Sequence, residues 1–108
     1  MREQKAFVYI LRLADGSLYT GWTTDPERRL AAHNGGRGAK YTRSRLPAEM
    51  VFCRECADRH AAMHSEAMIK KLSREQKLAL IAAPGLLPEL TERRECRERR
   101  KQHGRSGL

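Results

Sequence analysis

Three side chains capable of chemistry lie within one short stretch of the sequence: Tyr19, Arg29 and His33. Arg29 and His33 are four residues apart in a segment expected to be helical, so they lie one above the other on one helix face, while Arg28 should point elsewhere. If that face looks back at the strand that carries Tyr19, a phenol, a guanidinium and an imidazole can converge on one pocket. A guanidinium binds phosphate oxygens through its planar fork. The stretch is therefore a candidate site for phosphate chemistry.

The local sequence predicts the elements that position these residues. Residues 18–22 contain aromatic side chains suited to a strand. A helix start follows, and two signals for it compete by one residue. Pro26 at the first helical position would make Asp25 the cap, whereas Thr24 with Glu27 would form a capping box. Asn34-Gly35 should end the helix, because both residues tolerate the left-handed conformation.

A hairpin should join residues 6–13, predicted to be a central strand, to residues 18–22. A two-residue turn would place Tyr9 and Tyr19 on opposite faces of the sheet, because side chains alternate along a strand. A three-residue loop, 14–16, with Gly16 left-handed, would instead pair Tyr9 with Gly21. Both tyrosines would then be diagonal neighbours on one face, which Arg29 and a later carboxylate should also approach. We predict the three-residue loop.

After the first helix, a glycine-rich basic segment, residues 35–45, is predicted to be a loop that meets phosphates. Its candidate nucleic-acid-binding residues are Arg37, Lys40, Tyr41, Arg43 and Arg45. A third strand is expected at 48–55, with Met50 and Phe52 on one face. Asp58 should cap a second helix running to about residue 72, and Ser73 a third helix. Glu66 falls on the apolar stripe of the second helix, where an ion pair with Lys70 is the structural alternative to a functional role.

Length and composition limit the possible classes of protein. The 108 residues carry a net charge of +9, which favours a polyanionic partner such as nucleic acid. The sequence predicts one α/β (α+β) domain over residues 1–84, with a three-stranded, mainly antiparallel sheet flanked by about three helices. Residues 85–108 form a charged tail, expected to be disordered or a frayed helix. Without an apolar signal region or spanning segment, and with an odd number of cysteines, we expect a cytoplasmic protein with free thiols and no membrane contact.

The ordered set of motifs resembles the GIY-YIG nuclease family, in particular its small single-domain bacterial members. Phe7-Val8-Tyr9 stands where Gly-Ile-Tyr would be, and Tyr19-Thr20-Gly21 matches the second motif. The resemblance implies that Tyr9 and Tyr19 are the motif tyrosines, Arg29 the catalytic arginine, His33 the helix histidine and Glu66 the carboxylate that holds Mg²⁺ or Mn²⁺. Whether Tyr9, Tyr19 or His33 is the base stays open, since a tyrosine of ordinary pKa is a poor base at neutral pH.

The resemblance implies a metal-dependent endonuclease acting on DNA in repair or recombination, on branched or flapped forms, with RNA not excluded. The alternative is a non-catalytic nucleic-acid-binding module on the same fold. A partner protein and a homodimer are both left open.

A zinc site is the competing interpretation of a second cluster. Cys53, Cys56, His60 and His64 are the residue types of a tetrahedral zinc site. However, Cys53 falls within a predicted strand, and the gap from cysteines to histidines is much shorter than in zinc fingers. The sequence therefore favours free thiols here.

Overall fold

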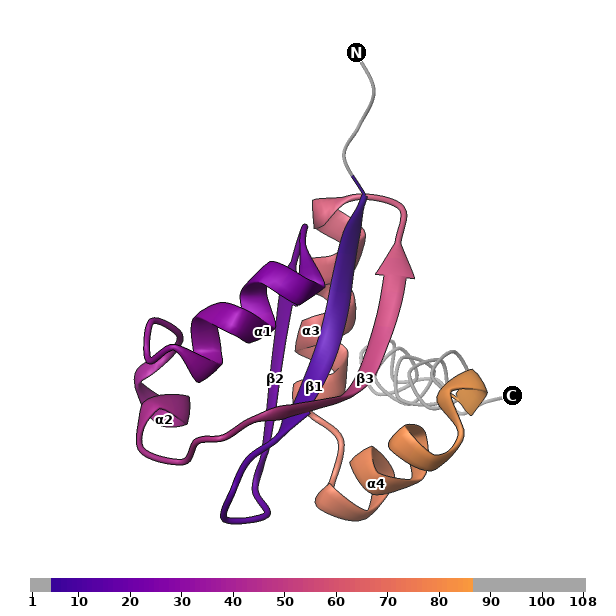
Figure 1. Ribbon diagram of the computed structural model, residues 1–108. Coiled ribbons are helices and arrows are strands. Elements are labelled where there is room, and N and C mark those ends of the chain that lie inside the picture. The colour runs from indigo at the N-terminus through magenta and orange to yellow at the C-terminus, as the bar shows by residue number, and fades with distance from the viewer. Residues whose placement is uncertain (1–4, 87–108) are drawn as a thin grey trace, which may run out of the picture. The chain divides into compact units, whose positions relative to one another are not determined.

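A three-stranded antiparallel sheet organises the part of the chain that the computed structural model describes, residues 5–86. Its strands are β1 (Ala6–Arg12), β2 (Leu18–Thr23) and β3 (Glu49–Cys56), in the order β2-β1-β3. Apolar side chains on both faces of β1 give it the central place, with most of its residues buried. The predicted α+β class is confirmed (Figure 1).

The β1–β2 hairpin has the predicted register. Tyr9 pairs with Gly21, and Leu11 pairs with Tyr19. Gly16 has a φ of +85°, the left-handed conformation that a bulged three-residue loop requires. The two tyrosines therefore lie on the same face of the sheet, as predicted.

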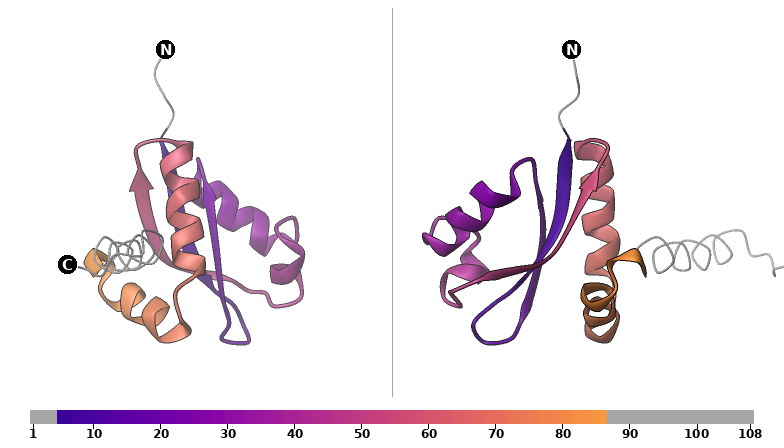
Figure 2. Two further views of the ribbon diagram at one scale, coloured as in Figure 1. Left: turned by 180° about the vertical axis from the view of Figure 1, so that it is seen from behind. Right: turned by 45° about the vertical axis from the view of Figure 1, so that its right-hand side comes forward.

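Helices cover the two faces of the sheet separately. Figure 2 shows α1 (Pro26–Asn34) on one face and α3 (Arg59–Lys70) on the other. At the start of α1, Asp25 is the cap: its carboxylate accepts a hydrogen bond from the backbone N–H of Arg28, at 3.2 Å, and Pro26 takes the first helical position. This geometry decides between the two predicted starts. Asp58 caps α3 as expected.

The end of α1 differs from the prediction in one detail. Gly35 has a φ of −87°, and the left-handed residue is Gly36, at +81°. Asn34 remains helical and uses its side-chain amide to bond both the N–H and the C=O of Ala48, at 2.7 and 3.0 Å. This pair of bonds ties the end of α1 to the chain just before β3.

The basic segment is not entirely a loop, contrary to the prediction. A short helix, α2 (Lys40–Arg43), forms within it, with backbone bonds from Thr42 and Arg43 to the carbonyl of Ala39. One turn of helix sends neighbouring side chains in different directions. Thr42 is fully buried, whereas Lys40 and Arg43 are exposed.

A bulge in β3 corrects the predicted pattern of its faces. Phe52 pairs with Ile10, but the next pair joins Leu11 to Met50 and skips Val51. Met50 therefore shares a face with Tyr9 rather than with Phe52. That face carries a core cluster that α1 helps to cover. Its members are Tyr9, Leu11, Leu13 and Ala48, with Tyr19, Leu30, Leu46 and Met50 packed against them.

The contacts divide the chain into two compact units, with the division after Lys71, and the domain boundary at residue 84 stays a prediction. The second unit contains α4 (Arg74–Ala82), opened by the predicted capping box between Ser73 and Gln76, and a 3₁₀ turn at Pro84–Leu86. The predicted tail, 85–108, falls almost entirely outside the described residues. Within residues 5–86, no helix has the length and apolar character needed to cross a membrane.

Candidate active site

The Tyr9 and His33 side chains form the centre of the candidate site. The hydroxyl oxygen of Tyr9 lies 3.1 Å from Nε2 of His33, and Nδ1 of the same ring lies 3.0 Å from Oγ1 of Thr42. The Tyr19 ring meets the His33 ring edge-on, with centroids 5.5 Å apart. The expected meeting of Tyr19 with the His33 imidazole is therefore present in the structure, and Tyr9 contacts the same ring.

Burial controls the proton chemistry of this pair. His33 is completely buried, and burial lowers its pKa, assisted by the positive charge of Arg29. Burial also raises the pKa of Tyr9, while hydrogen bonding and charge from Arg29 act in the opposite direction. Both groups are therefore neutral near pH 7. Because His33 has no exposed surface, it cannot meet a substrate directly and can only act through a neighbour.

Gly21 allows the Tyr9 hydroxyl to lie directly against β2. A Cβ at this position would lie 2.7 Å from the Tyr9 oxygen and 2.8 Å from its ring carbon Cζ. Real Cβ atoms do not approach other atoms so closely, so any side chain here would displace the tyrosine. Local sterics therefore explain why the third residue of the second motif is a glycine.

Glu66 reaches the site differently from the prediction. It belongs to α3, which covers the face of the sheet opposite α1, so the expectation that Arg29 and Glu66 approach from one side is wrong. Its charge nevertheless contributes to raising the pKa of Tyr9. The Glu66 carboxylate thus acts on Tyr9 from the α3 face of the sheet. On this face α3 packs against β2, which is an edge strand. The alternative ion pair is also present, with Lys70 Nζ 3.1 Å from the Glu66 carboxylate.

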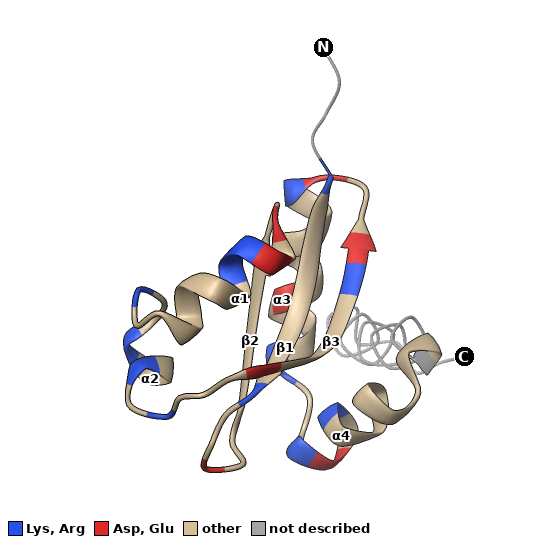
Figure 3. Cartoon of the chain, viewed as in Figure 1, with Lys and Arg blue, Asp and Glu red and all other residues tan. Residues whose placement is uncertain are grey.

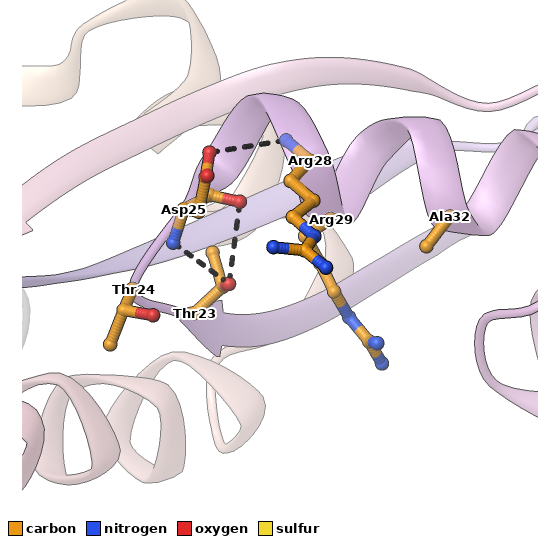
Figure 4. Close-up of a pocket in the computed structure, with 6 residues that line it drawn as sticks. All are labelled: Thr23, Thr24, Asp25, Arg28, Arg29 and Ala32. Carbon is orange, nitrogen blue, oxygen red and sulfur yellow. Dashed lines mark hydrogen bonds between the residues drawn. The ribbon is translucent and has the colours of Figure 1, made fainter.

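A pocket of about 410 Å³ opens beside Arg29, between the end of β2 and the start of α1. Its lining residues are Thr23, Thr24, Asp25, Arg28, Arg29 and Ala32 (Figure 4). Arg28 was expected to point elsewhere, but it lines the same pocket as Arg29. Two guanidinium groups at one polar pocket suit an anionic ligand.

Comparison with known proteins agrees with this geometry. Residues 5–79 match the family described as the GIY-YIG catalytic domain, a span that includes both tyrosines, Arg29, His33 and Glu66. The chain belongs to the GIY-YIG family.

Within the family, its relatives are small bacterial proteins. It is 52% identical over 79 residues to a UPF0213 protein of Streptococcus sanguinis (strain SK36), covering 73% of this chain and 91% of the relative. It is 52% identical over 83 residues to one from Streptococcus pyogenes serotype M5 (strain Manfredo), covering 76% and 90%. The names of these relatives state no activity.

Two solution structures resemble this GIY-YIG chain. UPF0213 protein BH0048 from Bacillus halodurans is 44% identical with a TM-score of 0.50, covering 81% of this chain and 93% of that protein. Protein EF2693 from E. faecalis is 41% identical with a TM-score of 0.54, covering 79% and 91%. The chain thus matches nearly the whole length of each.

The basic segment of this GIY-YIG domain lies beside the tyrosines. Lysine and arginine are concentrated on α2 and the segments that flank it (Figure 3). The Tyr41 ring stacks on Tyr19, with centroids 6.3 Å apart and planes 19° apart. Arg45 is less available than predicted, because its guanidinium lies 3.9 Å from the Tyr41 ring centre and donates to Asp15 and to the carbonyl of Tyr41. Arg37, Lys40 and Arg43 are exposed.

Two residues near His33 were missed from the sequence. Thr42 bonds the ring, and a Cβ at Gly38 would overlap His33 Nδ1, so this glycine allows the basic segment to pack on the imidazole. A threonine between Tyr41 and Arg43 in a basic segment gives no signal of burial unless the α2 turn is recognised. For the zinc hypothesis, residues 5–86 contain no cluster of three or more His, Cys, Asp or Glu placed to hold a metal. Cys53 and Cys56 are free thiols.

Proposed function

We propose that this protein is a metal-dependent endonuclease that hydrolyses phosphodiester bonds in DNA, with branched or flapped structures as the first substrates to test. The observation that carries the proposal is the hydrogen-bonded pair of Tyr9 and His33, which has Arg29 and Glu66 within electrostatic reach. A tyrosine whose only role was packing in the core would not need a buried imidazole, a guanidinium and a carboxylate around its hydroxyl. Phosphodiester hydrolysis needs a proton acceptor, a cation at the phosphoryl oxygens and help for the leaving oxygen.

We assign the role of base to Tyr9. The raised pKa of Tyr9 prevents it from ionising alone at neutral pH, so it must pass its own proton on. In the proposed step, a water oxygen forms the new bond to phosphorus while the phosphorus–oxygen bond to the leaving sugar oxygen breaks. The water proton goes to the Tyr9 oxygen, and the Tyr9 proton moves to Nε2 of His33, which becomes an imidazolium. The leaving oxygen takes a proton from solvent, and His33 later returns its proton through Tyr9, since the imidazole itself is buried.

Arg29 is assigned to the phosphate. It lines the open pocket at the end of β2 and also influences the pKa of Tyr9, so it can hold a phosphoryl oxygen close to the base. A planar fork can bind two oxygens of one phosphate at once. Arg28, on the same pocket, is placed to bind the next phosphate along the strand.

Glu66 is suited to the metal that the family implies. Its side chain is 21% exposed, and Mg²⁺ often binds through one or two carboxylates together with waters and substrate phosphates. Glu66 would therefore hold Mg²⁺ or Mn²⁺, which there supplies neutralisation of charge at the phosphate oxygens. Lys70 keeps the carboxylate paired until then.

The deciding experiment compares Glu66→Gln with Lys70→Met. Purified protein is incubated with labelled branched, nicked and linear DNA, and with matching RNA, with Mg²⁺ or Mn²⁺. Glu66→Gln removes the ligand charge without changing shape and should abolish cleavage while leaving DNA binding nearly intact. Lys70→Met breaks the same ion pair from the other side and should retain cleavage.

Two results would oppose the proposal. Equal cleavage by Glu66→Gln and the wild type would show that Glu66 has only the structural role of its ion pair with Lys70. DNA binding without cleavage of any substrate by the wild type would favour the non-catalytic binding module, which the exposed cations of the basic segment also fit.

A further inference from the structure

The imidazole of His33 is held at both nitrogens, and the second contact fixes where its proton sits. The Thr42 Oγ1 lies 2.8 Å from the carbonyl oxygen of Ala39 and 3.0 Å from Nδ1 of His33. Two oxygens 2.8 Å apart repel each other unless a proton lies between them, and a carbonyl carries none. The Thr42 proton must therefore point at Ala39. Its oxygen is then left to accept a hydrogen bond from His33, so Nδ1 carries the ring proton.

A neutral imidazole has one N–H and one lone pair. With the proton on Nδ1, the lone pair is on Nε2, which faces the hydroxyl oxygen of Tyr9 at 3.1 Å. Tyr9 is consequently the donor in that bond. Its oxygen lone pairs are turned away from His33 and remain available for other partners.

We propose that Thr42 is a positioning residue that fixes the Nδ1–H tautomer of His33 and thereby commits the Tyr9 proton to His33. The catalytic consequence rests on the proposed function, because a base must present a lone pair to water and have a partner for its own proton. The tautomer itself does not depend on any activity.

The surroundings of His33 leave the ring few alternatives. The imidazole is fully buried, so no solvent water can replace Thr42 as the partner of Nδ1. Gly38 packs directly against the Nδ1 side, which holds the ring plane in place. Burial and the charge of Arg29 both lower the pKa of His33, so the ring stays neutral and the distinction between its two tautomers is meaningful near pH 7.

Two substitutions at Thr42 separate its hydroxyl from its shape. Thr42→Ser keeps the hydroxyl and removes a methyl group, whereas Thr42→Val keeps the branched shape and removes the hydroxyl. Long-range ¹H–¹⁵N NMR spectra at pH 7.5 report which ring nitrogen is protonated, and a His33→Asn sample identifies the signals. We expect the Nδ1–H tautomer in the wild type and in Thr42→Ser, and a shift toward Nε2–H in Thr42→Val.

Cleavage kinetics on the same proteins test the consequence. Thr42→Val should lose about tenfold or more in kcat with little change in KM, because binding groups are untouched. Thr42→Ser should restore most of kcat. An Nε2–H tautomer in the wild type, or an unchanged tautomer in Thr42→Val, overturns the proposal. An altered tautomer with unchanged kcat overturns the positioning role.

If the wild type cleaves no substrate, the proposed function fails by itself. The NMR spectra still decide whether Thr42 sets the tautomer. If Thr42→Val does not fold, the spectrum of the wild type alone can refute the assignment.

Discussion

Replacing Gly21 with alanine tests whether the Tyr9 hydroxyl must keep its position against β2. The new Cβ would lie 2.7 Å from the Tyr9 oxygen, and ordinary van der Waals contact begins at 3.4 Å. The ring must therefore move by about 0.7 Å, although it is only 1% exposed and bonded to His33. A displacement near 1 Å in a catalytic group can cost on the order of 100-fold in rate. We expect kcat to fall by about 10-fold to 100-fold.

Gly21→Ala should also lower the free energy of unfolding, but this effect should be smaller than the effect on kcat. Overpacking a filled core costs about 1–3 kcal/mol, while replacing a strand glycine recovers roughly 0.5–1 kcal/mol through the unfolded chain. The free energy of unfolding should therefore fall by about 1–2 kcal/mol. In a domain of this size, each kcal/mol of lost stability lowers Tm by roughly 4–8 °C.

Urea unfolding and cleavage of the preferred DNA substrate measure the two effects of Gly21→Ala. Gly85→Ala is the matched control, because a Cβ at Gly85 meets nothing within 4 Å. Wild-type kcat in Gly21→Ala, together with a changed His33 NMR signal that reports the displacement of Tyr9, would refute the reasoning. It would mean that Tyr9 can move without consequence, so its hydroxyl is not the base.

Three further predictions address charge. Arg29→Ala should lower kcat/KM by about 100-fold or more, as for other groups that stabilise transition-state charge. Arg54 is an exposed charge on β3, so Arg54→Ala should not have this effect. Similar losses in the two variants would show that Arg29 takes no part in the chemistry. Because the pKa of His33 is lowered in the folded protein, the unfolded chain binds this proton more tightly. The free energy of unfolding should therefore fall as the pH drops below about 6.5. Urea titrations from pH 5 to 8 measure this dependence, which His33→Asn should weaken. Alanine at all three exposed cations of the basic segment should reduce the salt slope of duplex binding by about 0.9 per lost contact, and an unchanged slope would place DNA elsewhere. These cations are Arg37, Lys40 and Arg43.

The hairpin could be predicted from sequence because its determinants are local. Asp15-Gly16 specifies a turn, and only the loop with left-handed Gly16 keeps both tyrosines on one face. The structure has that register, it confirms the helix starts at Arg59 and Arg74, and it selects Pro26 from the two starts that the sequence left open. Caps and turns are decided by residues within a few positions of each other, so they can be recognised without tertiary contacts.

The missed features depend on contacts between distant segments. The burial of Thr42 requires both the α2 turn and a histidine nine residues earlier. The bulge that skips Val51 appears only when β3 is paired with β1. The face from which Glu66 approaches depends on how α3 crosses the sheet, which helical periodicity does not specify. Sequence reasoning therefore placed both tyrosines on one face of the sheet while misplacing one approach to the candidate site.

The hairpin register also determines whether the proposed site can exist. Groups on the two faces of a sheet are normally separated by the strands themselves, and here α1 and α3 lie on opposite faces. The observed pairing sets Tyr9 beside Gly21 on the edge strand β2, where the absence of a side chain leaves the space that the Tyr9 hydroxyl occupies. A slip of one residue would pair Tyr9 with Trp22 and put an indole in that space. The left-handed Gly16 is remote from the chemistry, yet it sets the register that lets the Tyr9 hydroxyl lie against Gly21 of β2.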